Sequence, residues 1–250
     1  PQPIIPNPQP IIPNPQPIIS VIHVQGIQPS ANDNGAGVLL IELYKDQGIS
    51  EYSFILGRNV HSKKYEIFGG NKEPHEYITE TARRELKEES SNLFRIPTKV
   101  LSYNNAVRHT YSPHSFVCFV IFIQGPVDGN GNHSIYGSHF YHNRGLMKHK
   151  DWMEMDDIMR ITKNEFVNAK GLTKGGDLPM NVTKNKKGKY VNIDITINGR
   201  DKAIIREAIN KGIYDNVIKK GPITLNLNDN YQPKPSENSV MYPGTKAYWI

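Results

Sequence analysis

Short runs of apolar residues, either alternating or uninterrupted, predict most of the strands of this chain. Residues 35–43 (GAGVLLIEL) and 52–56 (YSFIL) are expected to be neighbouring strands, and residues 65–68 a short third strand. Residues 115–123 (SFVCFVIFI) are apolar at nearly every position, which is typical of a central strand covered on both faces. Further strands are predicted at residues 21–28, 100–103 and 191–197.

A helical pattern is clearest between residues 76 and 89, where neither Gly nor Pro occurs. Ile78, Ala82 and Leu86 are spaced to form one apolar stripe, and Pro74 precedes the segment, as is tolerated at a helix start. Two more helices are expected. One covers residues 151–170, with Trp152, Met155, Met159 and Phe166 facing the core. The other is capped by Asp201 and runs to about Lys211.

The first helix carries an unusual concentration of acid. Glu85, Glu88 and Glu89 lie within one turn on one face, where three carboxylates repel one another. A divalent cation would remove this repulsion, and a set of carboxylate oxygens suits Mg²⁺ or Mn²⁺. The alternative is a solvated charged face on which Arg84 and Lys87 offset the acids.

A longer pattern favours the metal interpretation. Gly70, five residues, Glu76, seven residues and then Arg84-Glu85-Leu86-Lys87-Glu88-Glu89 resembles the signature of the Nudix hydrolases. The match covers 23 residues, with six fixed positions and the aliphatic position in agreement. It departs at Ser91, where the family has Gly, and at Asn92, where the family has an aliphatic residue. Asn92 can adopt the left-handed conformation that ends a helix, so the departure concerns the helix end rather than the metal site.

The resemblance implies an α/β fold, the Nudix α/β/α sandwich, with a mixed sheet between the metal helix and the helix at residues 151–170. It implies hydrolysis of a diphosphate linkage in a nucleoside diphosphate derivative, with Mg²⁺ or Mn²⁺ as cofactor. The resemblance implies that Glu85, Glu89 and the Gly70 carbonyl ligate the metal. It implies that Glu88 is a further metal ligand or a base, with Glu154 as the alternative base. It also implies that Arg84 orients the carboxylates, that Glu76 supports the preceding loop, and that Arg58 contacts substrate phosphate.

The remaining features concern domain organisation. Residues 1–20 repeat a Pro-rich heptapeptide (PQPIIPN), which favours polyproline II or disorder, either as an interaction tail or as a repeat of no consequence. Residues 21–170 are expected to form the Nudix domain, and residues 171–250 a basic C-terminal extension packed on it or trailing from it. The single cysteine, Cys118, excludes an internal disulfide framework and suits a reducing, cytoplasmic compartment. There is no apolar run long enough to span a membrane.

Charge and composition leave the substrate open. The chain has 30 Lys and Arg residues against 24 Asp and Glu residues. Residues 142–220 contain 17 of the Lys and Arg residues but only 10 of the Asp and Glu residues, so the C-terminal third is basic. Either an anionic partner such as a nucleotide or RNA, or a generic basic surface, explains this excess. The abundant Asn, Ile and Lys suggest an A/T-rich genome, such as that of some large DNA viruses; a viral protein would act in the host cytoplasm. Three functions therefore compete: a hydrolase of small nucleotides, an RNA 5′-end or cap hydrolase, and a catalytically silent Nudix-like binding module.

Overall fold

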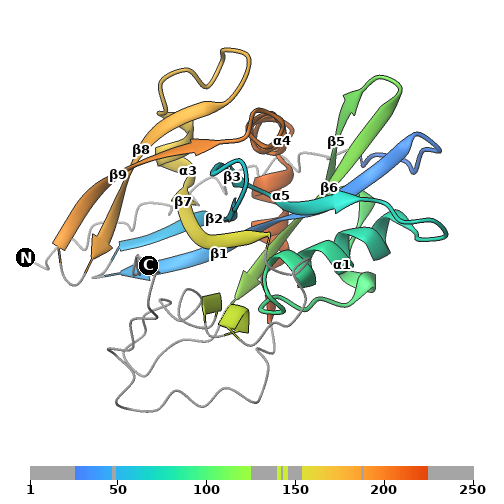
Figure 1. Cartoon of the computed structure of the whole chain (residues 1–250), viewed down its shortest axis with the longest axis horizontal. Coiled ribbons are helices and arrows are strands. Elements are labelled where there is room, and N and C mark those ends of the chain that lie inside the picture. Colours follow the sequence, from blue (N-terminus) through green and yellow to red (C-terminus); the bar gives the residue numbers. More distant parts are fainter. Residues whose placement is uncertain are drawn as a thin grey trace, which may run out of the picture.

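The computed structural model describes residues 26–46, 49–124, 140–141, 143–145, 154–186 and 189–224 (Figure 1). The Pro-rich repeat at residues 1–20 lies outside these ranges. The main strands are β1 (Asp33–Asp46), β2 (Ile49–Asn59), β5 (Ala106–Tyr111), β6 (His114–Gln124), β7 (Met155–Thr162), β8 (Leu178–Lys186) and β9 (Lys189–Ile197). Short strands are β3 (Tyr65–Glu66), β4 (Phe68–Asn71) and β10 (Ile223–Thr224). The structure also contains the α-helices α1 (Ile78–Glu89), α3 (Lys163–Val167), α4 (Gly199–Asn210) and α5 (Ile213–Lys220).

The strands belong to one mixed sheet with β1 at its centre. β1 pairs with β2 and β4 antiparallel and with β6 parallel, so Val38 lies opposite Phe119. Along its main path the sheet has the order β10-β6-β1-β2-β3-β9-β8, while β5 pairs with β6 and β7 pairs with β2. The expected α/β class with a mixed sheet is therefore confirmed.

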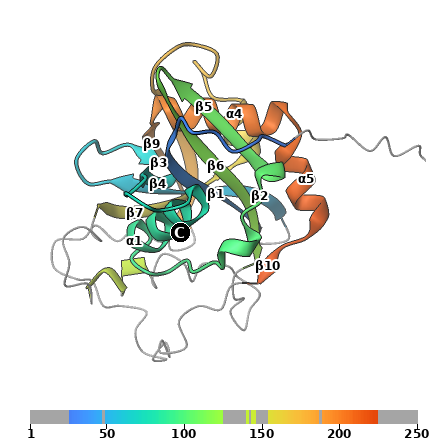
Figure 2. The ribbon, with the colours of Figure 1, turned by 90° about the vertical axis from the view of Figure 1, so that its right-hand side faces the viewer.

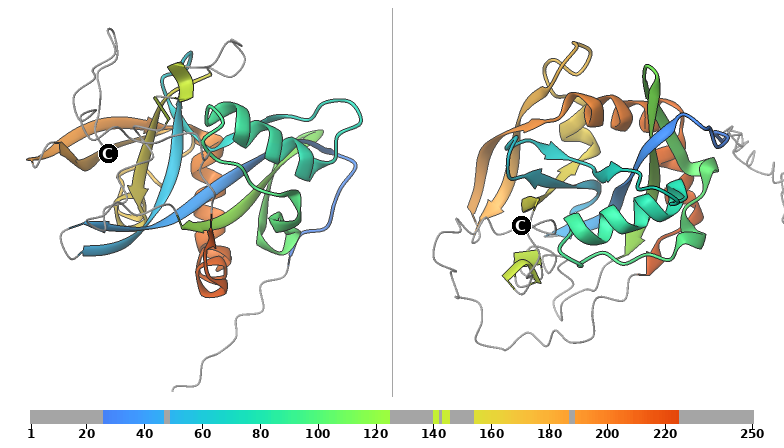
Figure 3. Two further views of the ribbon diagram at one scale, coloured as in Figure 1. Left: turned by 90° about the horizontal axis from the view of Figure 1, so that it is seen from below. Right: turned by 45° about the vertical axis from the view of Figure 1, so that its right-hand side comes forward.

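Helices cover both faces of this sheet, as Figures 2 and 3 show. On one face, the predicted stripe of α1 packs on β1 and β6, and Ile78, Ala82 and Leu86 are all buried there. On the other face, α3, α4, α5 and the β8–β9 hairpin enclose a second core that includes Phe54, Phe166 and Tyr214. β6 contributes to both cores, which confirms the prediction of a central strand covered on two sides. Cys118 is buried in this strand.

The predicted helix at residues 151–170 is wrong within the described residues. Residues 155–162 form strand β7, and only Lys163–Val167 is helical, as α3. Met155, Met159 and Phe166 are buried as expected, but Met155 and Met159 point into opposite cores. The strand also buries Asp157 and Arg160, and these polar residues conceal the period-two alternation in the sequence.

Three further predictions need correction. Residues 100–103 form no strand; two 3₁₀ turns, Thr98–Val100 and Tyr103–Asn105, occupy this stretch, and the strand begins at Ala106. Of the strand predicted at residues 21–28, residues 26–28 are not in a strand and the rest lie outside the described residues. Helix α4 is capped by Asn198, whose side chain accepts a hydrogen bond from the Arg200 N–H, and Asp201 lies in the first turn instead.

The residues after 170 contribute to the same sheet and the same core as those before. The hairpin and helices α4 and α5 supply core side chains such as Met180, Ile195 and Ile204. We infer that the folding unit continues to about residue 220 rather than ending at residue 170. In the described part of the chain, no helix combines the length and the apolar composition needed to cross a membrane.

Candidate functional site

The helix that carries the acidic residues is well defined at both ends. Glu80 accepts a hydrogen bond from the backbone N–H of Tyr77, the residue before α1, at 2.9 Å, which satisfies a donor at the helix start. At the other end Ser91 and Asn92 have φ angles of 52° and 63°. The Asn92 N–H donates to the Lys87 carbonyl at 2.6 Å, so the left-handed conformation predicted for Asn92 does end this helix.

Arg84 lies among the carboxylates of the signature and connects them. Its Nε donates to Glu76 at 2.8 Å, and its Nη1 contacts Glu85 at 2.8 Å and Glu88 at 3.2 Å. Hydrogen bonding to this guanidinium lowers the pKa of Glu76 to about 2. Glu76 also accepts from the Glu73 N–H, so it ties the loop before α1 to the helix. The orienting role of Arg84 and the loop-holding role of Glu76, which the resemblance implies, stay predictions.

Two glycines bring the preceding strand against the acidic face. The Gly69 N–H donates to the Glu89 carboxylate across the gap between β4 and α1. A Cβ atom on Gly70 would lie 2.6 Å from Glu85 Oε1, closer than a side chain tolerates. Residue 70 therefore has to be Gly for the Glu85 carboxylate to occupy its position.

The carboxylates on this face lie in a poorly solvated environment. Glu89 is 5% exposed, and burial, followed by the charge of Glu85, raises its pKa well above the usual range. Burial also raises the pKa of Glu85, although Arg84 opposes the shift. The charge of Glu154 adds to both increases, so this distant residue has been brought close to Glu85 and Glu89. Glu154 precedes β7, and its carbonyl accepts from the Val60 N–H at 2.7 Å.

Arg58 lies on the β2–β7 side of the site. Its Nε donates to Asp156 at 2.6 Å, and Lys63 Nζ donates to the other oxygen of the same carboxylate at 3.1 Å. In the described part of the chain, Nη1 and Nη2 of Arg58 have no hydrogen-bond partner. Arg58 is thus held by an acid, with its terminal nitrogens available to an anion.

Sequence reasoning missed the acids that anchor the start of β7. Asp157 is buried and accepts hydrogen bonds from the hydroxyl groups of Tyr65 at 2.7 Å and Tyr141 at 2.5 Å. Together with the Arg58–Asp156 pair, this contact fixes the strand that begins directly after Glu154. The available signal was the Asp156-Asp157 pair inside an otherwise apolar stretch. Glu66 was also missed, and its charge further raises the pKa of Glu89.

The donor set suits a hard divalent cation in its chemistry. Glu85, Glu88, Glu89 and Glu154 offer oxygen atoms only, and the burial of Glu89 beside Glu85 leaves negative charge that a cation would stabilise. Among the described residues, no three acidic, His or Cys side chains converge closely enough to hold an ion as they stand. The guanidinium of Arg84 contacts oxygens of both Glu85 and Glu88. A cation at this site would compete with Arg84.

The comparisons with known proteins gave matches among solved structures. The chain is similar to a MutT/nudix family protein from Enterococcus faecalis, with 13% identity and a TM-score of 0.41 over 77% of this chain and 66% of that one, just under two thirds of its length. It is similar to a mutT/nudix family protein from Listeria innocua, with 12% identity and a TM-score of 0.40 over 76% of this chain and 99% of that one. It is also similar to an Ap4A hydrolase from C. elegans, with 18% identity and a TM-score of 0.32 over 50% of this chain and 77% of that one. No family model and no curated protein matches the sequence.

Proposed function

We propose that the protein is a divalent-metal-dependent Nudix hydrolase that cleaves a diphosphate linkage in a nucleoside diphosphate derivative. The observation that supports this most is that Glu154, just before β7, lies near enough to Glu85 and Glu89 of α1 for its charge to raise the pKa of both. The signature supplies Glu85 and Glu89 within one helical turn, but Glu154 is separated from them by 65 residues or more and reaches them only through the fold.

Each of the site residues has a separate role in the proposed reaction. Glu85, Glu89 and the Gly70 carbonyl would hold Mg²⁺ or Mn²⁺. When bound, the cation would neutralise the negative charge of the diphosphate oxygens. Arg84 holds Glu85 and Glu88 in position through its guanidinium. Glu88 or Glu154 accepts the proton of the attacking water. Arg58, with two terminal nitrogens available, contacts a phosphate oxygen.

The test is hydrolysis of a substrate panel with Mg²⁺ or Mn²⁺, comparing wild type with Glu85→Gln and Glu89→Gln. The panel contains nucleoside diphosphate derivatives, a dinucleoside polyphosphate and a capped RNA. We expect each variant to lose at least about a hundredfold in turnover while it keeps its fold, because a carboxylate that holds a metal typically contributes several kcal/mol to the transition state. Glu207→Gln, on α4 and paired with Lys211, is the matched control and should keep full activity.

Near-normal turnover of either variant at saturating metal would contradict the assignment of the site. The panel also separates the competing functions. Cleavage of the capped RNA alone would favour the RNA 5′-end hydrolase, and tight nucleotide binding without any turnover would favour the silent binding module.

A further inference from the structure

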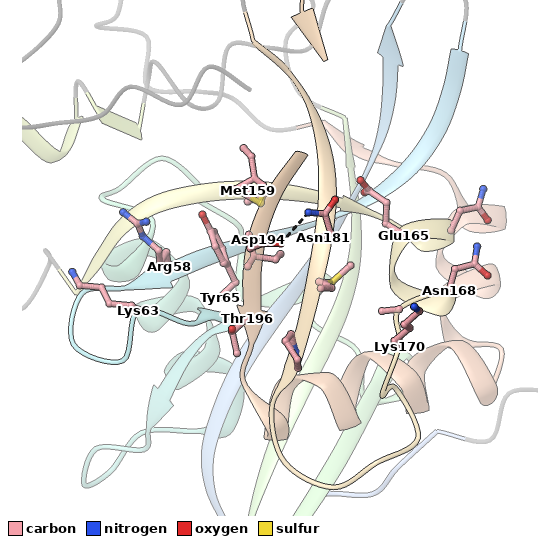
Figure 4. Close-up of a pocket in the computed structure, with 16 residues that line it drawn as sticks. Arg58, Lys63, Tyr65, Met159, Glu165, Asn168, Lys170, Asn181, Asp194 and Thr196 are labelled. Carbon is pink, nitrogen blue, oxygen red and sulfur yellow. Dashed lines mark hydrogen bonds between the residues drawn. The ribbon is translucent and has the colours of Figure 1, made fainter. Parts of the chain in front are cut away.

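A groove of about 950 Å³ lies between the β8–β9 hairpin and the strand β7 with its following helix α3 (Figure 4). This volume is within the range of small-molecule sites. Figure 4 shows Arg58 and Lys63 at one end and Asn168 and Lys170 at the other. One wall is the hairpin, which belongs to the part of the chain for which the Nudix resemblance supplied no positions.

The Arg58 end of the groove is cationic. Arg58 and Lys63 share the carboxylate of Asp156, and the buried Asp157 also acts on Arg58. The side chain of Arg58 is 30% exposed, and that of Lys63 is 64% exposed. An anionic group can therefore reach both cations from the groove.

The body of the groove combines apolar surface with side-chain amides. Met159, Met180 and Ile195 contribute apolar groups, Asn168 and Asn181 contribute amides, and Glu165 and Asp194 contribute carboxylates. Asn181 donates to Asp194 across the hairpin at 2.9 Å, and no described residue is bonded to the side chain of Asn168. An amide presents a donor and an acceptor side by side, which is the pattern that the edge of a nucleobase requires.

The cationic end adjoins the carboxylate site. Arg58 holds Asp156, which lies two residues after Glu154, and the Glu154 carbonyl accepts from the N–H of Val60, two residues after Arg58, at 2.7 Å. Tyr65 lines the same end of the groove, and β4, which follows it closely in the chain, donates the Gly69 N–H to the Glu89 carboxylate. The Arg58 end of the groove is therefore connected to the carboxylate site through Glu154 and through the short strands β3 and β4.

We propose that this groove binds the nucleoside part of the substrate, with the nucleobase against the amides and the 5′ phosphate at Arg58. The proposal rests on the proposed hydrolase function and deepens it, because it gives the choice of base to the C-terminal hairpin. The ligand is a single nucleotide unit, since one phosphate and one base account for the cationic end and the amide-bearing body.

The test measures binding of the four ribonucleoside monophosphates to the full chain by calorimetry, with all divalent metal chelated so that no hydrolysis occurs. We expect sub-millimolar binding of at least one monophosphate and no comparable binding of inorganic phosphate. Thr196→Trp, at a position that lines the groove on β9, should weaken this binding at least about tenfold. Asn192→Trp lies on the same strand face outside the groove lining and should leave the binding unchanged.

A second measurement covers the case in which Thr196→Trp does not fold. Hydrogen–deuterium exchange of the wild-type chain should show protection of residues 164–170 and 178–182 when the monophosphate is added. The inference is overturned if no monophosphate binds, if Thr196→Trp binds as well as wild type, or if these segments show no protection. Glu85→Gln should bind the monophosphate normally. Failure of the hydrolase proposal would instead appear as full turnover by Glu85→Gln, so the two failures are distinguishable.

Discussion

The acidic helix with its glycine loop, residues 69–92, and the C-terminal part of the described chain, residues 154–224, are built in opposite ways. In the first region the partners are close in sequence: Arg84 contacts Glu76, Glu85 and Glu88. In the second region the contacts are distant: Asp157 is held by Tyr65, and Asp201 accepts a hydrogen bond from the Ile67 N–H. The first region contains the proposed chemistry, and the second completes the core and lines the groove.

The comparison indicates that the proposed chemistry depends on the first region, while much of the stability of the fold depends on the second. A local motif needs a surrounding fold to bring Glu154 to it and to bury Glu89. The C-terminal part supplies that fold without any recognisable motif of its own. Three predictions test this division, beginning with the largest effect.

Truncation after residue 170 should abolish cooperative folding. It removes β8, β9, α4 and α5, and with them Met180, Ile195 and Ile204 from the core, which exposes the face of the sheet that they cover. Burial of a single such side chain is worth about 1.5–3 kcal/mol, so the loss of a whole layer exceeds the stability of a typical domain. Circular dichroism during thermal and urea unfolding would measure this.

The matched truncation removes residues 1–20 instead and should leave the melting temperature unchanged, because a Pro-rich repeat has no regular way to join a core. A cooperative unfolding transition of residues 1–170 would place the boundary of the folding unit at residue 170 and contradict our inference.

Gly70→Ala should affect activity more than stability. The added Cβ would meet the Glu85 carboxylate at 2.6 Å and push it from its place beside Arg84. We expect turnover to fall at least about tenfold, while the free energy of unfolding falls by less than about 1 kcal/mol, because the Glu85 carboxylate is the flexible end of its side chain and can move aside. Gly175→Ala is the control, because nothing lies within 4 Å of its Cβ position. Equal activity of the two variants would show that the spacing between Gly70 and Glu85 is not required.

The smallest effect concerns the pH dependence of stability, in which two buried acids, Asp33 at the start of β1 and Asp201 on α4, should behave oppositely. For Asp33, burial alone would raise the pKa, but hydrogen bonds from Arg108 and Ser115 outweigh it and lower the pKa. Its contribution is therefore present above the unfolded pKa of about 3.9 and is lost as the pH falls through the lower folded value. For Asp201, burial outweighs Arg200 and raises the pKa. Its contribution is full below pH of about 3.9 and declines as the pH rises through the folded value.

Urea unfolding of Asp33→Asn and Asp201→Asn between acidic and neutral pH would measure this, with wild type subtracted at each pH. Asp33→Asn should cost about 1–3 kcal/mol at neutral pH, with the cost shrinking in acid. The cost of Asp201→Asn should instead be larger in acid than at neutral pH. Parallel curves for the two variants would contradict the opposite pKa directions.

The same difference between local and distant contacts explains which features could be predicted from the sequence. The α1 stripe, the central strand β6 and the left-handed Asn92 were predictable because each depends on neighbours within a few residues. The helix predicted at residues 151–170 failed because Asp157 and Arg160 are buried in β7 by partners outside the segment, namely Tyr65 and Tyr141 for Asp157 and Glu42 for Arg160. Nothing within residues 154–162 reveals those partners. The groove was unpredictable for the same reason, since its lining comes from β2, β7, α3 and the hairpin.

The late position of α4 and α5 in the chain has a consequence for biosynthesis. The ribosome completes β1, β2 and β6 by Gln124, but the helices that cover one face of these strands end only at Lys220. At roughly 5–20 residues per second, the interval is on the order of ten seconds. During this time the apolar side chains of that face, among them Leu39, Phe54 and Val120, have no cover from the C-terminal layer. The nascent chain is therefore expected to depend on chaperones that shield exposed strands until the last two helices emerge.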